Sequence, residues 1–270
     1  MASASPTTSS DALARRFEAL RGSARRALVP YVTAGHPDRA SSLALLRGLE
    51  AAGADVVEIG VPFSDPMADG PVIQASSQRA LAQGMSFDAT LELIAEARLT
   101  IPVVLFSYLN PILAAGPEAL RRAADAGAHG ILITDLPVGA DAERERWLGD
   151  GPLAFIRLVA PTTPRDRMAE IARHGSGFVY LISRLGVTGA RDALAADLPE
   201  TVAKLRNATR LPICVGFGIS TPAQAAAVAG LADGVVVGSA IVAAAQRDID
   251  EALALTRALR KAIDQACAAS

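Results

Sequence analysis

Eight short apolar runs, rich in β-branched residues, recur along the chain, and this recurrence constrains the fold most strongly. The runs occupy residues 27–33, 55–61, 102–108, 130–135, 154–159, 178–183, 212–216 and 235–238. Such nearly continuous apolar runs are typical of parallel strands covered by helices. Amphipathic stretches separate them, among them residues 41–52, 117–126, 165–174 and 222–229. The alternation predicts an α/β fold, a single (β/α)₈ TIM barrel, with a doubly wound open sheet as the alternative.

A short repeated pattern favours the barrel. Residues 52–57 (AGADVV), 126–131 (AGAHGI) and 231–236 (LADGVV) each end a helix with small residues and begin a strand. Glycine can adopt the left-handed helix cap, and small residues let a helix and a strand pack closely. The pattern marks the helix-to-strand side of the barrel. We therefore expect the chemistry at the opposite ends of the strands.

Composition excludes several classes of protein. With 51% hydrophobic residues and a net charge of −2, the chain of 270 residues can bury a core and has no clustered basic face for nucleic acid. No apolar run reaches the roughly 18 residues that span a bilayer. Cys214 and Cys267 are predicted to be reduced thiols of a cytoplasmic protein. Residues 1–11 are predicted to be a disordered tail rather than a signal peptide, and residues 12–270 a single catalytic domain.

Three glycine clusters follow the last three strands. They occupy residues 186–189 (GVTG), 216–220 (GFGIS) and 238–240 (GSA). Glycine lets backbone N–H groups approach an anion, and a helix N-terminus adds a favourable dipole. Barrel enzymes often hold phosphate in the loops after strands 7 and 8. Any one cluster could be an ordinary turn, but three at consecutive strand ends predict a phosphate site, with Ser239 as an additional hydroxyl donor.

The densest polar segment is residues 58–71 (EIGVPFSDPMADGP). Strand alternation puts Glu58 on the face opposite Ile59, so we expect it to point into the barrel mouth. An unpaired buried carboxylate is costly and has a raised pKa, which suits a general acid or base near neutrality. A salt-bridged structural glutamate is the alternative. Asp65 and Asp69 follow in the loop, where either could instead serve as a turn residue.

The distribution of lysine and histidine narrows the chemistry. Lys204 and Lys261 both fall in predicted helices, so no strand end offers a lysine for a Schiff base. His129 and His174 precede strands, which leaves His36 alone near the mouth and makes a histidine metal site improbable. A barrel with a phosphate-binding site, but with neither a Schiff-base lysine nor a histidine metal site, would rely on carboxylates for proton transfer.

These motifs together resemble the tryptophan synthase alpha chain family. The segment 58–71 is similar to the family signature, and the resemblance continues through residues 30–35, 134–137, 180–189 and 215–220. It covers essentially all of the chain after the N-terminal tail. The departures are mild, such as Met67 where leucine is more usual.

The resemblance implies a lyase that cleaves indole-3-glycerol phosphate to indole and glyceraldehyde 3-phosphate. Glu58 would be the general acid and base, and Asp69 the carboxylate that stabilises positive charge on the indole ring. The positions that match the phosphate site are Gly189, Gly218, Gly238 and Ser239, with Phe217 and Gly216 alongside. The positions that match the indole pocket and its support are Tyr31, Phe106, Leu132, Thr134, Tyr180 and Thr188. Residues 189–198 would form a mobile lid.

The resemblance also implies a partner. The family's alpha chain binds a beta chain in an α₂β₂ heterotetramer, and here residues 65–74 and 107–113 would make the contact. Pyridoxal phosphate would belong to the beta chain, so this chain would carry no cofactor and no metal. Three alternatives remain: a stand-alone lyase that releases free indole, another barrel enzyme acting on a phosphorylated sugar, and an inactive scaffold that only activates a beta chain.

Overall fold

The structure, a computed structural model, describes residues 11–183 and 197–268, and its centre is a closed barrel. Each strand pairs in parallel with the next along the chain, and β8 pairs with β1. The strands are β1 (Ala27–Thr33), β2 (Val57–Gly60), β3 (Val103–Ser107), β4 (Gly130–Ile133), β5 (Ala154–Val159), β6 (Val179–Ile182), β7 (Ile213–Gly216) and β8 (Gly234–Val237). The predicted TIM barrel is confirmed, and the open sheet is excluded.

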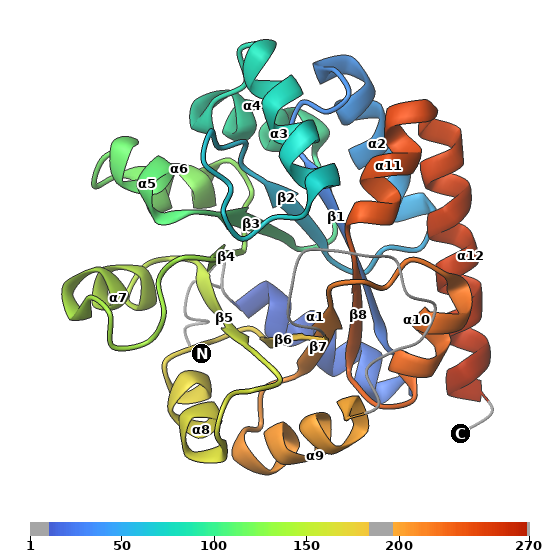
Figure 1. Ribbon diagram of the computed structural model, residues 1–270. Helices are drawn as coiled ribbons and strands as arrows, with labels where there is room; N and C mark the ends of the chain where they lie inside the picture. Colours follow the sequence, from blue (N-terminus) through green and yellow to red (C-terminus); the bar gives the residue numbers. More distant parts are fainter. Residues whose placement is uncertain (1–10, 184–196, 269–270) are drawn as a thin grey trace, which may run out of the picture.

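Helices surround the strands in the order of the chain (Figure 1). They are α1 (Asp11–Gly22), α2 (Arg39–Ala51), α3 (Pro71–Ala82), α4 (Phe87–Ala97), α5 (Leu109–Ala114), α6 (Ala119–Asp125), α7 (Ala142–Gly149), α8 (Arg165–Arg173), α9 (Leu198–Ala208), α10 (Pro222–Ala229), α11 (Ser239–Arg247) and α12 (Ile249–Ala268). Two helices, rather than one, follow each of β2, β3 and β8. No helix within the described ranges is long and apolar enough to cross a membrane.

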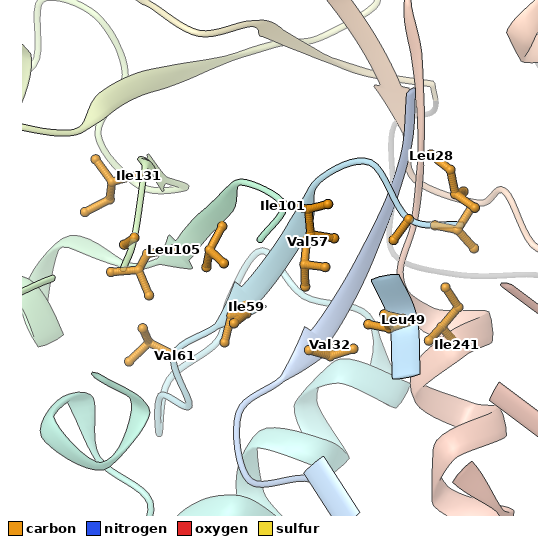
Figure 2. Packing of buried hydrophobic residues seen from close by; sticks show 14 of the residues in the cluster. Leu28, Val32, Leu49, Val57, Ile59, Val61, Ile101, Leu105, Ile131 and Ile241 are labelled. Carbon is orange, nitrogen blue, oxygen red and sulfur yellow. The ribbon is translucent and has the colours of Figure 1, made fainter. Parts of the chain in front are cut away.

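The alternation of side chains along the strands separates two apolar layers. Val57 and Ile59 of β2 belong to the larger layer, which lies between the strands and the surrounding helices (Figure 2). Val56, in contrast, belongs to the smaller layer with Val104 and Val236, inside the ring of strands. Because successive side chains of a strand point to opposite faces, Glu58 faces inward, as the sequence predicts.

Helix α1 closes the N-terminal end of the barrel. Leu13, Phe17 and Leu20 are buried in the inner layer, and the ring of Phe17 lies 5.7 Å from that of Phe178. In Figure 1 this helix lies across the strands instead of outside them. Helix α1, which is not among the elements expected from the sequence, begins at Asp11, next to the expected start of the domain.

Two of the three helix-to-strand repeats have the predicted left-handed glycine, with φ of +99° at Gly53 and +106° at Gly127. Strand β2 begins at Val57, later than expected. Asp55 lies before the strand. Its side chain accepts a hydrogen bond of 2.9 Å from the backbone N–H of Leu28 and forms ion pairs with Arg16 and Arg260. These charges lie at the end of the strands opposite the barrel mouth.

Candidate active site

Glu58 lies in the middle of β2 with its side chain inside the barrel. Its Cα partners are Tyr31 on β1 and Val104 on β3. The residue is fully buried. Burial and then the charge of ionised Glu58 raise the pKa of Tyr180, and burial, the charge of Asp233 and then that of ionised Glu58 raise the pKa of Cys214. The side chain of Glu58 therefore points into a space that residues of β1, β6 and β7 also line.

Within residues 11–183 and 197–268, the Glu58 carboxyl group has no hydrogen-bond partner at either oxygen. Because burial disfavours the charged form, the pKa of Glu58 rises to about 8. A salt-bridged structural glutamate would show the opposite, a cationic partner and a lowered pKa. Glu58 is thus a neutral acid at pH 7 that can give a proton and take it back.

Asp69 ends the loop between β2 and α3. The backbone N–H of Asp69 donates to the carbonyl of Pro66 at 3.1 Å, and the side chain of Gln74 donates to the carbonyl of Asp69 at 2.9 Å. Helix α3 begins at Pro71, a residue with no N–H to lose and a φ suited to a first helical turn. The loop is therefore held to the helix that follows it, and Asp69 is buried with 8% of its surface exposed.

Tyr108 is the hydrogen-bond partner of the Asp69 carboxylate. It caps the N-terminus of α5 just after β3, and its hydroxyl accepts a hydrogen bond of 2.9 Å from the backbone N–H of Ala68. The same hydroxyl hydrogen bonds Asp69. Burial raises the pKa of Asp69 to about 6 and the bond from Tyr108 opposes that rise, so Asp69 is mostly ionised at pH 7.

Aromatic side chains line the space between the two carboxylates. The rings of Tyr31 and Phe106 meet edge to face with centroids 5.3 Å apart, and those of Tyr180 and Phe217 do so at 5.8 Å. Burial, followed by the negative charges of Asp69 and Glu58, raises the pKa of Tyr31. Its hydroxyl is consequently close to both acids.

Leu132 and Thr134 complete the sequence-predicted pocket residues in the described ranges. Leu132 is buried in the inner layer beside its Cα partner Phe106. Thr134 is only partly buried after β4, and its hydroxyl donates to the carbonyl of Ser107 at 3.4 Å. Both stand next to β3, on the side of the barrel that also carries Tyr108.

The glycine clusters after β7 and β8 form the other side of the mouth. Phe217 and Gly218 have positive φ values of 69° and 81°, and the hydroxyl of Ser183 hydrogen bonds the carbonyl of Phe217. Gly238 is the N-cap residue of α11 without a side-chain cap, and Ser239 begins that helix on the surface. The first N–H groups of α11 are therefore available to an anion.

The structure brings together Glu58, Asp69 and the predicted wall residues at one end of the barrel. Gly189 and Thr188, and the predicted lid 189–198 except its last two residues, lie outside the described residues. Tyr108 and Gln74 were not assigned site roles from sequence, although Tyr108 ends a predicted strand at the mouth. Among residues 11–183 and 197–268, no group of three His, Cys, Asp or Glu side chains could hold a metal ion.

Comparison with known proteins gives one consistent result. The family model described as "Tryptophan synthase alpha chain" matches residues 17–269. The alpha chain of Caulobacter sp. (strain K31) is 50% identical over 236 residues, covering 86% of this chain and 86% of that one. The alpha chain of Geobacter sp. (strain M21) is 52% identical over 230 residues, or 84% of this chain and 86% of that one.

Solved structures agree. A chain of tryptophan synthase from Mycobacterium tuberculosis superposes with a TM-score of 0.86 and 36% identity, covering 93% of this chain and 97% of that chain. The alpha subunit from Legionella pneumophila str. Paris superposes with a TM-score of 0.85 and 35% identity, covering 96% and 99%. The similarity therefore extends over nearly the whole length of both proteins.

Proposed function

The chain belongs to the tryptophan synthase alpha chain family, and we propose that Glu58 and Asp69 are the two carboxylates with which it performs the family's reaction. That reaction is a lyase step of tryptophan biosynthesis, the cleavage of indole-3-glycerol phosphate to indole and glyceraldehyde 3-phosphate. The observation that carries the proposal is the pair of buried carboxylates, one inside the barrel and one in the loop after β2, with pKa values of about 8 and about 6. At pH 7 one is an acid and the other an anion, which is the division of labour that the reaction needs.

Glu58 supplies the proton transfers. As a neutral acid it protonates C3 of the indole ring, which creates an indolenine cation. The resulting carboxylate then accepts the proton of the hydroxyl on the side-chain carbon bonded to C3. The C–C bond breaks, its electrons return to the ring, and that carbon becomes the aldehyde of glyceraldehyde 3-phosphate. Glu58 ends the cycle protonated, as it began.

Asp69 stabilises the charge that forms in between. Its carboxylate accepts a hydrogen bond from the indole N–H, whose nitrogen becomes positive when C3 is protonated. An anion fixed in a largely buried loop stabilises this charge more than water does, because it needs no reorientation during the step. The hydrogen bond from Tyr108 supports the ionised state of Asp69.

The remaining sequence-predicted residues hold the substrate. Tyr31, Phe106, Leu132, Thr134 and Tyr180 enclose the indole ring. The substrate phosphate binds to the backbone of Gly218, Gly238 and Ser239 at the N-terminus of α11, next to Gly216 and Phe217. Gly189 adds a further backbone contact. Thr188 holds Asp69 when residues 189–198 close as a lid. The roles of Gly189, Thr188 and the lid rest on the family resemblance alone.

A beta chain is the partner of this subunit in an α₂β₂ assembly. The support is where the exposed large apolar side chains lie: of the four in the described part of the chain, Met67 at 83%, Val72 at 36% and Leu113 at 37% belong to segments 65–74 and 107–113, the expected contact segments. Pyridoxal phosphate belongs to the beta chain, and the alpha chain carries no cofactor. We place the assembly in the cytoplasm.

Indole release from indole-3-glycerol phosphate tests the proposal. We expect slow turnover by the wild type alone, strong stimulation by a beta chain, and loss of turnover in Glu58→Gln and Asp69→Asn. Asp65→Asn is the matched control without the beta chain, because Asp65 lies in the same loop but is exposed. Activity that survives Glu58→Gln would contradict the two-carboxylate mechanism. Fast turnover that a beta chain does not change would identify a stand-alone lyase.

A further inference from the structure

Three hydroxyl side chains form a hydrogen-bonded chain that leads from the barrel mouth to α3. The hydroxyl of Tyr31 lies 3.5 Å from that of Thr33, which lies 2.7 Å from that of Ser76. The Ser76 hydroxyl lies 2.8 Å from the backbone carbonyl of Ile73. Thr33 and Ser76 are each 1% exposed, so water does not compete for these bonds.

The end of this chain fixes the direction of the bond between Thr33 and Ser76. A carbonyl oxygen can only accept, so the hydroxyl of Ser76 donates its single proton to the carbonyl of Ile73. Thr33 must then donate to Ser76, and Thr33 has no proton left for Tyr31. The Tyr31 oxygen therefore accepts no hydrogen bond from Thr33, which lies 3.5 Å away. Its lone pairs are left for an acceptor role.

The Tyr31 oxygen lies where a substrate group could donate a hydrogen bond to it. The negative charge of Asp69 acts on this hydroxyl, and so does that of Glu58 when Glu58 is ionised. The oxygen also lies 2.0 Å from the point that a Cβ of Gly60 would occupy, so it rests against the backbone of β2 where the mouth begins. A substrate bound between the two carboxylates would lie beside a hydroxyl oxygen whose lone pairs are not used by Thr33.

We propose that Tyr31 is a specificity-determining residue, whose oxygen accepts a hydrogen bond from a glycerol O–H group of the substrate, and that Thr33 and Ser76 are positioning residues that leave its lone pairs free. The inference rests on the proposed function and adds a polar role to a residue otherwise expected only to pack on indole. Phenylalanine at position 31 would keep the ring and lose the acceptor.

The first experiment measures binding by Tyr31→Phe. We expect KM for indole-3-glycerol phosphate to rise about threefold to tenfold, the worth of one hydrogen bond. The Kd of indole-3-propanol phosphate, which lacks both glycerol hydroxyls, identifies the donor. We expect that Kd to be unchanged, because Asp69 already accepts from the indole N–H and the donor to Tyr31 is a glycerol hydroxyl. A Kd that rises by the same factor would overturn the proposal. An unchanged KM for the substrate would overturn the proposal.

The second experiment tests the polarity of the chain. In Ser76→Ala the proton of Thr33 is free to turn to Tyr31, whose own proton can then turn to the mouth, so KM should rise as in Tyr31→Phe. Ser76→Thr keeps the hydroxyl and should restore KM. Ser77→Ala is the matched control, because Ser77 is the next residue of α3, is also buried and has no part in the chain.

A double-mutant cycle separates this effect from simple loosening of α3. With phenylalanine at position 31, Ser76→Ala should raise KM no further, because the oxygen that Ser76 orients is gone. Additive effects would overturn the positioning role. Loss of activity in Glu58→Gln and Asp69→Asn with no effect of Tyr31→Phe would reject this inference alone. Activity retained in both carboxylate variants would reject the proposed function first.

Discussion

The hydroxyl of Tyr108 hydrogen bonds the Asp69 carboxylate and, at 2.9 Å, accepts from the backbone N–H of Ala68. A side chain just after β3 thereby binds the backbone of the loop that follows β2 and stabilises the ionised form of Asp69 in that loop. The ring of Tyr108 also packs against Phe63, with centroids 5.1 Å apart.

Tyr108→Phe should shift the acidic limb of activity. The hydrogen bond lowers the pKa of Asp69, so its removal raises that pKa above about 6 and leaves less Asp69 ionised at neutral pH. The pH profile of kcat/KM should show its acidic limb moved to higher pH, with a larger loss at pH 6 than at pH 8. A uniform loss across all pH values would mean that Tyr108 only supports the loop.

Glu58 should destabilise the folded protein above its ordinary pKa. A folded-state pKa of about 8 against an ordinary 4.5 means that the folded state binds this proton more tightly. Its favourable contribution is complete below pH 4.5 and is lost as the pH rises through 8, on the order of 5 kcal/mol at most. Glu58→Gln should therefore raise Tm at pH 8 and leave it nearly unchanged at pH 4.

Thermal unfolding at the two pH values checks this expectation. Glu92→Gln, on the exposed side of α4, is the control and should change Tm little at either pH. A Glu58→Gln variant that is less stable at pH 8 would show that the carboxylate has a favourable partner in solution, contrary to its isolation here.

Gly60→Ala should disturb the mouth without unfolding the barrel. A Cβ at this position would lie 2.0 Å from the hydroxyl oxygen of Tyr31 and 2.6 Å from its Cζ, so the ring must move. We expect kcat/KM to fall at least tenfold while the circular dichroism spectrum is retained, and Tyr31→Phe to recover part of the loss. Gly149→Ala at the end of α7 is the control, because a Cβ there meets nothing within 4 Å.

The charges at the closed end of the barrel should affect stability and not chemistry. Asp55 is 1% exposed and ion pairs with Arg16 at 2.6 Å and with Arg260 at 2.9 Å. Asp55→Asn leaves the buried Arg260 without this anion and should cost about 3–5 kcal/mol of unfolding free energy. Arg247→Ala, which breaks an exposed pair with Glu251, should cost less than about 1 kcal/mol. Urea denaturation measures both, and the turnover of folded protein should be unchanged.

Met67→Asp should weaken the interaction with a beta chain. Met67 is 83% exposed beside the mouth, and a carboxylate there would be costly to bury in an interface. We expect stimulation by the beta chain to fall while turnover of the isolated chain stays the same. Leu231→Asp is the control, since Leu231 is exposed at the other end of the barrel, before β8. Equal loss in both variants would place the contact elsewhere.

The sequence by itself determined the barrel, the inward direction of Glu58 and the end of the strands at which the site forms. Periodicity was sufficient because covered parallel strands must be apolar on both faces, so a glutamate within such a run stands out. The predicted bounds of β1 and β5 agree with the structure to the residue. The start of β2 does not, because the Asp55 side chain takes part in ion pairs that distant α1 and α12 complete.

Only the tertiary structure decided how the two carboxylates differ. The isolation of Glu58 depends on what seven other strands place around it, and the state of Asp69 depends on Tyr108, 39 residues away along the chain. The polarity of the chain from Tyr31 through Thr33 to Ser76 is likewise invisible in sequence, since any of these hydroxyls could donate or accept. Local pattern fixes which face a side chain takes, but pKa and hydrogen-bond direction are set by neighbours that only folding brings together.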